Sequence, residues 1–231
     1  MIKSNEIMML IDTSKCIACR ACQVACKQWH RLKDEKTTFE GTYQNPPDLS
    51  GKTLTLVRFN ELEESGKLKW LFFKDQCRHC VRPRCKDACP EGVEIDSDTG
   101  AVIFNEKATK ENSRIPLEEA CPYNVPRYSE DLGRYVKCDL CYDRFKHAQL
   151  GTGKFKGQFG NSQKPACELT CPSGAISTGT AKKILEEARK RLGVVKSNGH
   201  PNAFIYTGGY GSETHVIWLL TDEPSKYGLP K

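Results

Sequence analysis

The chain has 231 residues, of which 38% are hydrophobic and 28% are charged, and its formal net charge is +6. These proportions fit a soluble globular protein, and no apolar run approaches the roughly 18 residues that a membrane-spanning helix needs. We therefore expect no membrane span and, because the first residues contain neither an apolar signal region nor a twin-arginine pair, no independent export of the chain.

The first predicted element is a short strand at residues 7–11, where five apolar residues stand together. It leads into a first run of cysteines with the spacing C-x2-C-x2-C-x3-C. This run consists of Cys16, Cys19, Cys22 and Cys26. Residues 21–29 predict a short helix that carries the last two of these cysteines. Residues 33–52 are polar and contain two consecutive prolines, so we expect an irregular loop.

A second predicted strand, at residues 68–73, also runs directly into a run of cysteines, which Pro90 follows. This second run consists of Cys77, Cys80, Cys85 and Cys89. Residues 93–95 and 101–104 flank the turn-forming sequence Asp-Ser-Asp-Thr-Gly, which predicts a hairpin. Cys121, again followed by proline, is the only member of the third group.

The fourth group of cysteines is divided by an insertion at residues 145–165, which is rich in glycine and lysine. The group consists of Cys138, Cys141, Cys167 and Cys171. A proline follows Cys171 as well, and residues 174–176 then predict a short strand. The repeated Cys-Pro pair indicates that one binding unit recurs along the chain.

The last part of the chain predicts one helix and two strands. Residues 182–192 have a helix-forming composition with a single apolar face, which we expect to pack on the rest of the protein. The residues of this face are Ile184, Leu185, Ala188 and Leu192. Residues 203–206 and 215–220 predict a terminal pair of strands.

The 13 cysteines are the strongest indication of function. An odd number leaves one thiol unpaired in a pure disulfide framework, and the chain alone has no signal for an oxidising compartment. Metal binding is therefore the better interpretation. Four thiolates around a cluster core of charge +2 carry about −2 in total, so three such clusters offset the net charge of +6. The positive charge is thus weak evidence for nucleic acid, and we expect no such partner.

The spacing of the first run favours [4Fe-4S] clusters over zinc. In bacterial ferredoxins the first three cysteines of such a run wrap one cubane, and the fourth ligates a different cluster. A zinc site instead uses two C-x2-C pairs that are separated by a longer spacer. Basic residues near the cysteines either raise reduction potentials, dock an acidic carrier or are solvated surface charges. They are Lys27, Arg78, Arg82, Arg84, Arg127 and Arg144.

The chain resembles the iron–sulfur subunits of molybdenum and tungsten bis-pterin oxidoreductases. The similar phrases are CIACRACQVACKQW from Cys16, CPYNVPR from Cys121, CDLCYDR from Cys138 and CPSGAI from Cys171. The phrase ACKQW and the tail EPSKYGLP from Glu223 are most similar to the small subunit of formate dehydrogenase. The resemblance covers nearly the whole chain.

The resemblance implies a crosswise assignment of twelve ligands to three [4Fe-4S] clusters. The three sets are Cys16, Cys19, Cys22 and Cys171; Cys26, Cys138, Cys141 and Cys167; and Cys77, Cys80, Cys85 and Cys121. Where the family has three further cysteines, this chain has Glu111, Arg114 and Leu117. A fourth cluster should therefore be missing and Cys89 should be a free thiol. A competing assignment gives Cys89 to the cluster of the second run and frees Cys121.

The resemblance also implies an α+β fold with two pseudo-symmetric ferredoxin-like lobes. Residues 1–52 and 132–180 would form the first lobe with two clusters, and residues 53–131 the second lobe with one cluster and one vacant seat. Residues 181–231 would be a C-terminal extension of helix and strands that packs on the lobes and on a partner.

The resemblance implies a subunit that transfers electrons and has no catalytic residues of its own. The loss of one cluster, the short chain and the lack of a C-terminal anchor are most like the soluble formate dehydrogenases with a three-cluster small subunit. A catalytic partner would hold the Mo or W bis-pterin cofactor, and a cytochrome c or ferredoxin would be the carrier. We expect periplasmic co-export with a signal-bearing partner; the cytoplasm is the alternative. Other open functions are a subunit of a sulfur-compound or sulfoxide oxidoreductase and a free-standing polyferredoxin.

Overall fold

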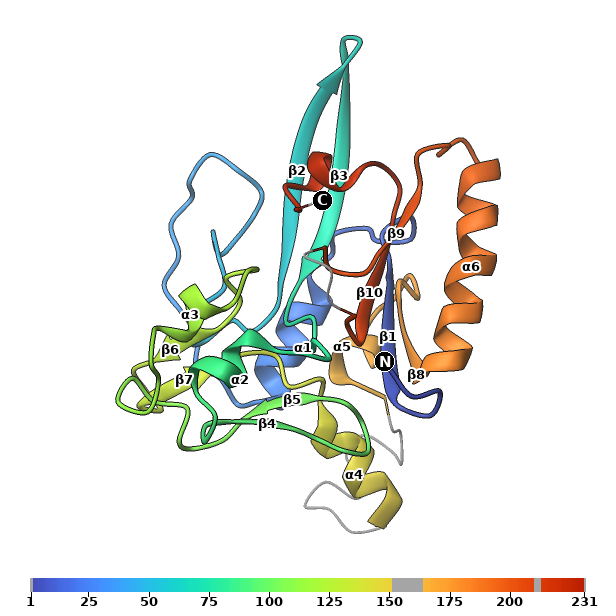
Figure 1. Ribbon diagram of the computed structural model, residues 1–231. Coiled ribbons are helices and arrows are strands. Elements are labelled where there is room, and N and C mark those ends of the chain that lie inside the picture. Colours follow the sequence, from blue (N-terminus) through green and yellow to red (C-terminus); the bar gives the residue numbers. More distant parts are fainter. Residues whose placement is uncertain (1, 151–163, 210–212, 231) are drawn as a thin grey trace.

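The computed structural model describes residues 2–150, 164–209 and 213–230 (Figure 1). Most of the predicted insertion at residues 145–165 therefore lies outside the described residues. In the part that is described, no helix combines the length and the apolar character that crossing a membrane requires.

A four-stranded sheet joins the two ends of the chain. Its strands, in spatial order, are β8 (Ile176–Thr180), β1 (Ile7–Asp12), β10 (Val216–Leu220) and β9 (Phe204–Tyr206). β1 pairs antiparallel with β8 and parallel with β10, and β10 pairs antiparallel with β9. The predicted terminal pair of strands is thus confirmed. The strand predicted at residues 174–176 begins only at the last of these residues.

The two central strands are apolar on both sides because both faces of this sheet are covered. The helix α6 (Ala181–Ser197) covers one face, where Ile184 and Ala188 pack against Met8 and Leu10 of β1. The alternate residues of β1 and β10 face the opposite way and join a second apolar cluster near the cysteines. The predicted helix and its apolar face are confirmed, although the helix extends to Ser197.

A long hairpin of β2 (Leu56–Glu64) and β3 (Lys67–Asp75) projects from the body of the molecule (Figure 1). Its base is anchored where Phe73 stacks on Trp218 of β10, with 5.1 Å between the ring centroids. The strand predicted at residues 68–73 lies within β3, which extends one residue before it and two residues after it. β2 was not predicted, because its outer half contains three glutamates and is formed by pairing with β3 rather than by its own propensity.

The remaining elements are short, and most lie next to cysteines. The hairpins are β4 (Val93–Ile95) with β5 (Val102–Phe104), and β6 (Arg127–Ser129) with β7 (Arg134–Val136). The helices are α1 (Ala21–Trp29), α2 (Arg84–Ala88), α3 (Leu117–Ala120), α4 (Tyr142–Leu150), α5 (Ala166–Leu169) and the 3-10 turn η1 (Pro224–Tyr227). The predicted β4–β5 hairpin and the predicted α1 are confirmed.

Candidate metal centres

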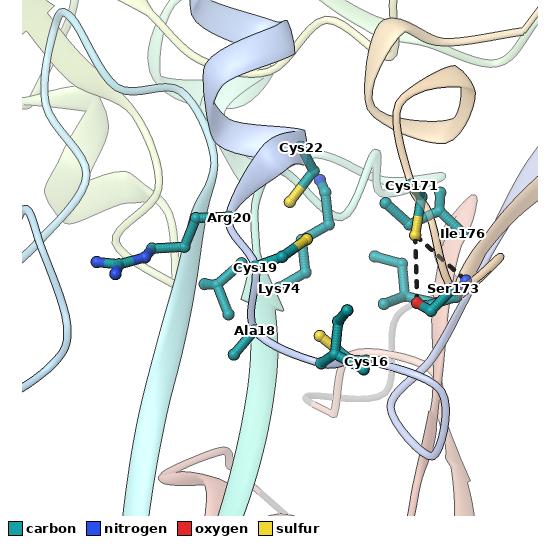
Figure 2. A pocket seen from close by; sticks show the side chains of 13 residues that line it. Cys16, Ala18, Cys19, Arg20, Cys22, Lys74, Cys171, Ser173 and Ile176 are labelled. Carbon is teal, nitrogen blue, oxygen red and sulfur yellow. Dashed lines mark hydrogen bonds between the residues drawn. The ribbon is translucent and has the colours of Figure 1, made fainter.

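Pocket I is formed where the first cysteine loop meets the turn before β8 (Figure 2). The thiols that line it belong to Cys16, Cys19, Cys22 and Cys171. Ala18 and Arg20 have left-handed backbone conformations, with φ of 53° and 62°, which curl the loop around the pocket. The Sγ atom of Cys171 accepts the backbone N–H of Ala175 at 3.3 Å. Cys19 is exposed, so this pocket reaches the protein surface.

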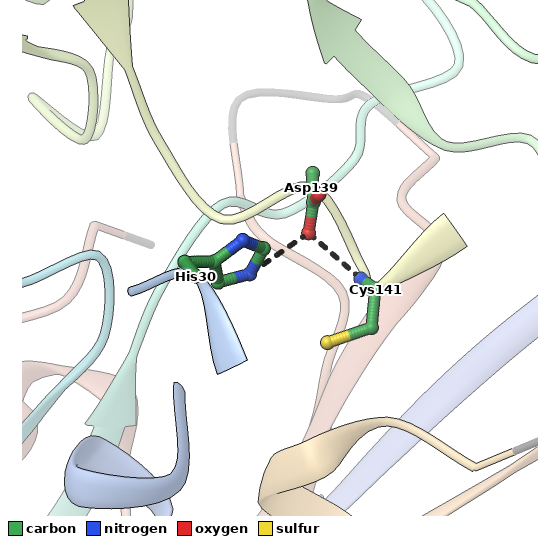
Figure 3. A group of neighbouring side chains, drawn as sticks. All are labelled: His30, Asp139 and Cys141. Carbon is green, nitrogen blue, oxygen red and sulfur yellow. Dashed lines mark hydrogen bonds and ion pairs between the residues drawn. The ribbon is translucent and has the colours of Figure 1, made fainter. Parts of the chain in front are cut away.

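Pocket II lies deeper, between α1, α5 and the loop that precedes α4. The thiols that line it belong to Cys26, Cys138, Cys141 and Cys167, and all four residues are buried. Leu140 and Cys141 have left-handed conformations, with φ of 64° and 50°. Asp139 accepts the N–H of Cys141 at 2.9 Å and lies 3.4 Å from Nε2 of His30, so it holds the loop and the ring together (Figure 3).

Pocket III is formed between the second cysteine run and the end of α3. The thiols that line it belong to Cys77, Cys80, Cys85 and Cys121. The left-handed conformation of His79, with φ of 50°, turns its N–H toward Sγ of Cys77 at 3.4 Å. The structure therefore brings twelve cysteines together in three sets of four. That these thiols ligate clusters stays a prediction.

The thiols of these pockets are suited to a metal and poorly suited to exist as free thiolates. Burial raises the pKa of Cys22 in pocket I, of Cys141 in pocket II and of Cys80 and Cys85 in pocket III to about 12. A buried thiolate needs positive charge beside it, which iron ions supply, and iron binding displaces the thiol protons. Four soft donors, backbone N–H groups aimed at sulfur and apolar walls fit an iron–sulfur cluster.

Cys89 lies outside all three pockets. It is 0% exposed, and its thiol donates to the carbonyl oxygen of Lys107 over 3.6 Å. We call the apolar cluster around it the Cys89 core. The core consists of Cys85, Ala88, Cys89, Val93, Val102, Phe104, Ala108, Leu117, Ala120 and Tyr135. Leu117 is 0% exposed, whereas Glu111 and Arg114 are exposed. Of these three positions only Leu117 is thus part of the apolar packing around Cys89.

Two lysines that the sequence analysis did not single out lie between the pockets. Lys74 lines both pocket I and pocket II. Lys137 lines pocket III and donates to the carbonyl oxygen of Cys138, a residue of pocket II, at 3.0 Å. Burial lowers the pKa of each ammonium group, but neighbouring cysteines raise it, and the net result lies above the ordinary value. The signal in the sequence that could have drawn attention to Lys74 is its position as a charged residue directly after the apolar stretch Trp-Leu-Phe-Phe.

The basic residues that lie near the cysteines in the sequence differ in their surroundings. Arg78 is 3% exposed, pairs with Asp75 and lies over the ring of Tyr123 at 4.7 Å, so it is part of the wall of pocket III and not a surface charge. Arg144 is 5% exposed and lies over the ring of Trp29 at 4.2 Å. Lys27, by contrast, keeps part of its side chain in solvent and pairs with Glu35 at 3.5 Å.

Two family models match the chain, and both describe a 4Fe-4S dicluster domain. One matches residues 15–93 and the other residues 68–154. The protein is therefore a [4Fe-4S] protein with ferredoxin-like dicluster domains.

Known proteins that are similar to almost the whole chain show to which family of [4Fe-4S] proteins it belongs. The nitrate-inducible formate dehydrogenase iron–sulfur subunit of Escherichia coli is 42% identical over 98% of this chain and 73% of its own length. The formate dehydrogenase 2 subunit beta (cytochrome c-553) of Nitratidesulfovibrio vulgaris and the formate dehydrogenase subunit beta of Megalodesulfovibrio gigas are each 40% identical, over 94% of both chains. The chain belongs to the family of formate dehydrogenase iron–sulfur subunits. It is an electron-transfer subunit that acts with a catalytic partner.

Proposed function

We propose that this chain holds three [4Fe-4S] clusters in a row and relays electrons between a catalytic subunit and a carrier protein. The catalytic subunit binds the Mo or W bis-pterin cofactor and interconverts formate and carbon dioxide. The ligands are Cys16, Cys19, Cys22 and Cys171 in pocket I; Cys26, Cys138, Cys141 and Cys167 in pocket II; and Cys77, Cys80, Cys85 and Cys121 in pocket III. Cys89 is not a ligand.

The observation that carries this proposal is that each of pockets I, II and III is lined by four thiols from distant parts of the chain. Pocket I combines three cysteines of the first run with Cys171, and pocket III combines three of the second run with Cys121. Each bound cluster would take up and release one electron. The chain itself supplies the thiols, the N–H donors and the apolar walls that exclude water.

The order of the row is pocket I, pocket II, pocket III. Lys74 is shared by the first two pockets, and Lys137 joins pocket III to Cys138 of pocket II. All four cysteines of pocket II are buried, whereas pocket I includes the exposed Cys19. Electrons would therefore enter and leave at the two outer pockets, because transfer to another protein requires a cluster near the surface.

The lobes follow the same crosswise pairing. Residues 1–52 with 132–180 would form a lobe around pockets I and II, and residues 53–131 a pseudo-symmetric lobe around pocket III and the Cys89 core. Residues 181–231 would extend the first lobe, since β10 and β9 join the sheet of β1 and β8.

A cytochrome c or a ferredoxin would receive or supply the electrons at the far end of the row. One relative carries cytochrome c-553 in its name, which supports a cytochrome. We also propose that this chain works in the periplasm and crosses the membrane together with its catalytic partner.

The test uses the native complex, purified without oxygen. Formate should bleach the broad visible absorbance of the clusters. Native mass spectrometry of this subunit should give a load of about 12 iron atoms, three cubanes of four. A load of about 16 would overturn the assignment of three clusters. Bleaching by dithionite and not by formate would keep the relay but reject formate as the electron source, which moves the search to sulfur-compound oxidoreductases.

A further inference from the structure

Lys74 and Lys137 are cations in the interior of the protein, with 3% and 6% of their surface exposed. Their acceptors among the described residues are neutral. Lys74 donates to Oγ1 of Thr55 at 2.9 Å and to the side-chain oxygen of Gln76, and Lys137 donates to the carbonyl oxygens of Val102 and Cys138. Burying an ammonium group without a counter-charge is strongly unfavourable. Each lysine therefore needs an anion that neutral acceptors do not supply.

Asp139 is the carboxylate among the principal electrostatic partners of Lys137, but it does not supply the counter-charge that the lysine requires. Asp139 raises the pKa of Lys137 less than Cys77, Cys85 and Cys138 do, and its Oδ1 atom already accepts from His30 and from the N–H of Cys141. Lys74 has no carboxylate among its principal electrostatic partners.

The cysteines themselves are the groups of opposite charge around each lysine. Lys74 and Cys22 both line pocket I (Figure 2), and the charge interactions of Lys74 are with Cys22 and with three cysteines of pocket II. Lys137 interacts with Cys77 and Cys85 of pocket III and with Cys138 of pocket II. Each lysine thus lies between two sets of four thiolates, and a cluster bound by four thiolates carries about −2 when oxidised and −3 when reduced by one electron.

We propose that Lys74 is a buried counter-charge shared by the clusters of pockets I and II, and Lys137 one shared by those of pockets II and III. Each lysine favours the more negative, reduced form and so raises the reduction potentials of both clusters beside it. One charge thus acts on two neighbouring clusters, and the cluster of pocket II, which lies beside both lysines, is raised by both of them. This inference rests on the proposed assignment of three clusters.

The test is a redox titration of the native complex followed by electron paramagnetic resonance. One cysteine-to-serine variant per pocket first assigns each signal to its cluster. Lys74→Met should lower the equilibrium constant for reduction about tenfold at pockets I and II, which is about 59 mV for one electron, and change pocket III much less. Lys137→Met should act on pockets II and III instead. Lys190→Met, which removes an exposed charge of α6, should leave all three potentials unchanged.

The iron load of each variant separates the possible failures. A wild-type load other than about 12 iron atoms would overturn the assignment of three clusters, whereas unchanged potentials in fully loaded variants would overturn only the role of the lysines. Equal shifts of all three potentials in both variants would also overturn it, because they would report a general loosening of the protein. If Lys74→Met fails to retain the clusters of pockets I and II, Lys74→Arg decides the matter: it should restore them if the positive charge is what they require, and failure to restore them refutes the proposal.

Discussion

Cys85 and Cys89 lie one helical turn apart, yet their surroundings differ. Both are buried, with 9% and 0% of their surface exposed, so burial does not distinguish them. Cys85 lines pocket III together with three other thiols, whereas Cys89 lies in an apolar core and donates to a backbone carbonyl. The comparison teaches that a buried cysteine can serve as a cluster ligand only where further soft donors surround the same space.

The Cys89 core also differs from pocket III in how its volume is filled. Around Cys89 the space is occupied by side chains, Leu117 among them. A methyl group built on Gly92 would lie 2.6 Å from Sγ of Cys89 and 2.6 Å from Cα of Ala108, so the packing leaves no spare room. Removing ligands without filling their space would leave a destabilising cavity.

The largest effect is expected from Cys85→Ala, which removes a thiol of pocket III. The subunit should lose about four iron atoms, and electron transfer from formate to the carrier should stop, because one member of the row is missing. Native mass spectrometry measures the first result and stopped-flow absorbance the second. Cys121→Ala should have the same effect; full iron in that variant would favour the competing assignment, in which Cys121 is free.

Leu117→Ala tests the other side of the comparison. The change opens a cavity in the Cys89 core and should cost about 2 to 5 kcal/mol, or roughly 4 to 20 °C in the unfolding temperature, with the iron load unchanged. Thermal scans of all variants are run at the same heating rate, because the unfolding of cluster proteins is under kinetic control and the apparent unfolding temperature depends on that rate. Leu132→Ala, at a position 51% exposed, is the matched control and should shift the unfolding temperature little. Loss of iron in Leu117→Ala would show that the packing of the Cys89 core is needed to hold the cluster of pocket III, with which the core shares Cys85.

Gly92→Ala adds volume to the same core instead of removing it. The backbone of Ala108 blocks the new methyl group and cannot move freely, so we expect a loss of about 1 to 3 kcal/mol. Gly133→Ala is a poor control because of its positive φ, whereas a methyl group at Gly193 of α6 meets nothing within 4 Å and should be neutral or stabilising. A neutral Gly92→Ala would mean that the core has room that the structure does not show.

The spacing of the first cysteine run was sufficient to predict iron–sulfur binding, because the ferredoxin run is a local pattern, whereas the groups of thiols that meet were predicted only through the resemblance to a known family. Helix α6 and the β4–β5 hairpin were predictable for a similar reason, since each has a periodicity or a turn sequence of its own.

Other features depended on contacts that a sequence does not display. β2 is a strand because β3 lies beside it, and its three glutamates conceal this. The filling of the Cys89 core was not foreseen either: Leu117 was recognised as unable to ligate, but nothing in the sequence shows that it packs against Cys89. The buried position of Lys74 required knowing that pockets I and II both adjoin β3.

The smallest effect is expected from Cys89→Ala, and it tests the comparison most directly. If Cys89 is only a packing residue, its loss should leave the iron load, the cluster signals and the rate of reduction by formate unchanged. The removed sulfur should cost about 1 kcal/mol, or roughly 2 to 4 °C in the unfolding temperature. Cys89→Ser separates packing from ligation further: a hydroxyl group has nearly the volume of the thiol but is polar, so in an apolar core it should destabilise at least as much as alanine does, again with full iron. Four iron atoms lost in either variant would make Cys89 a ligand and would remove the distinction between the two regions.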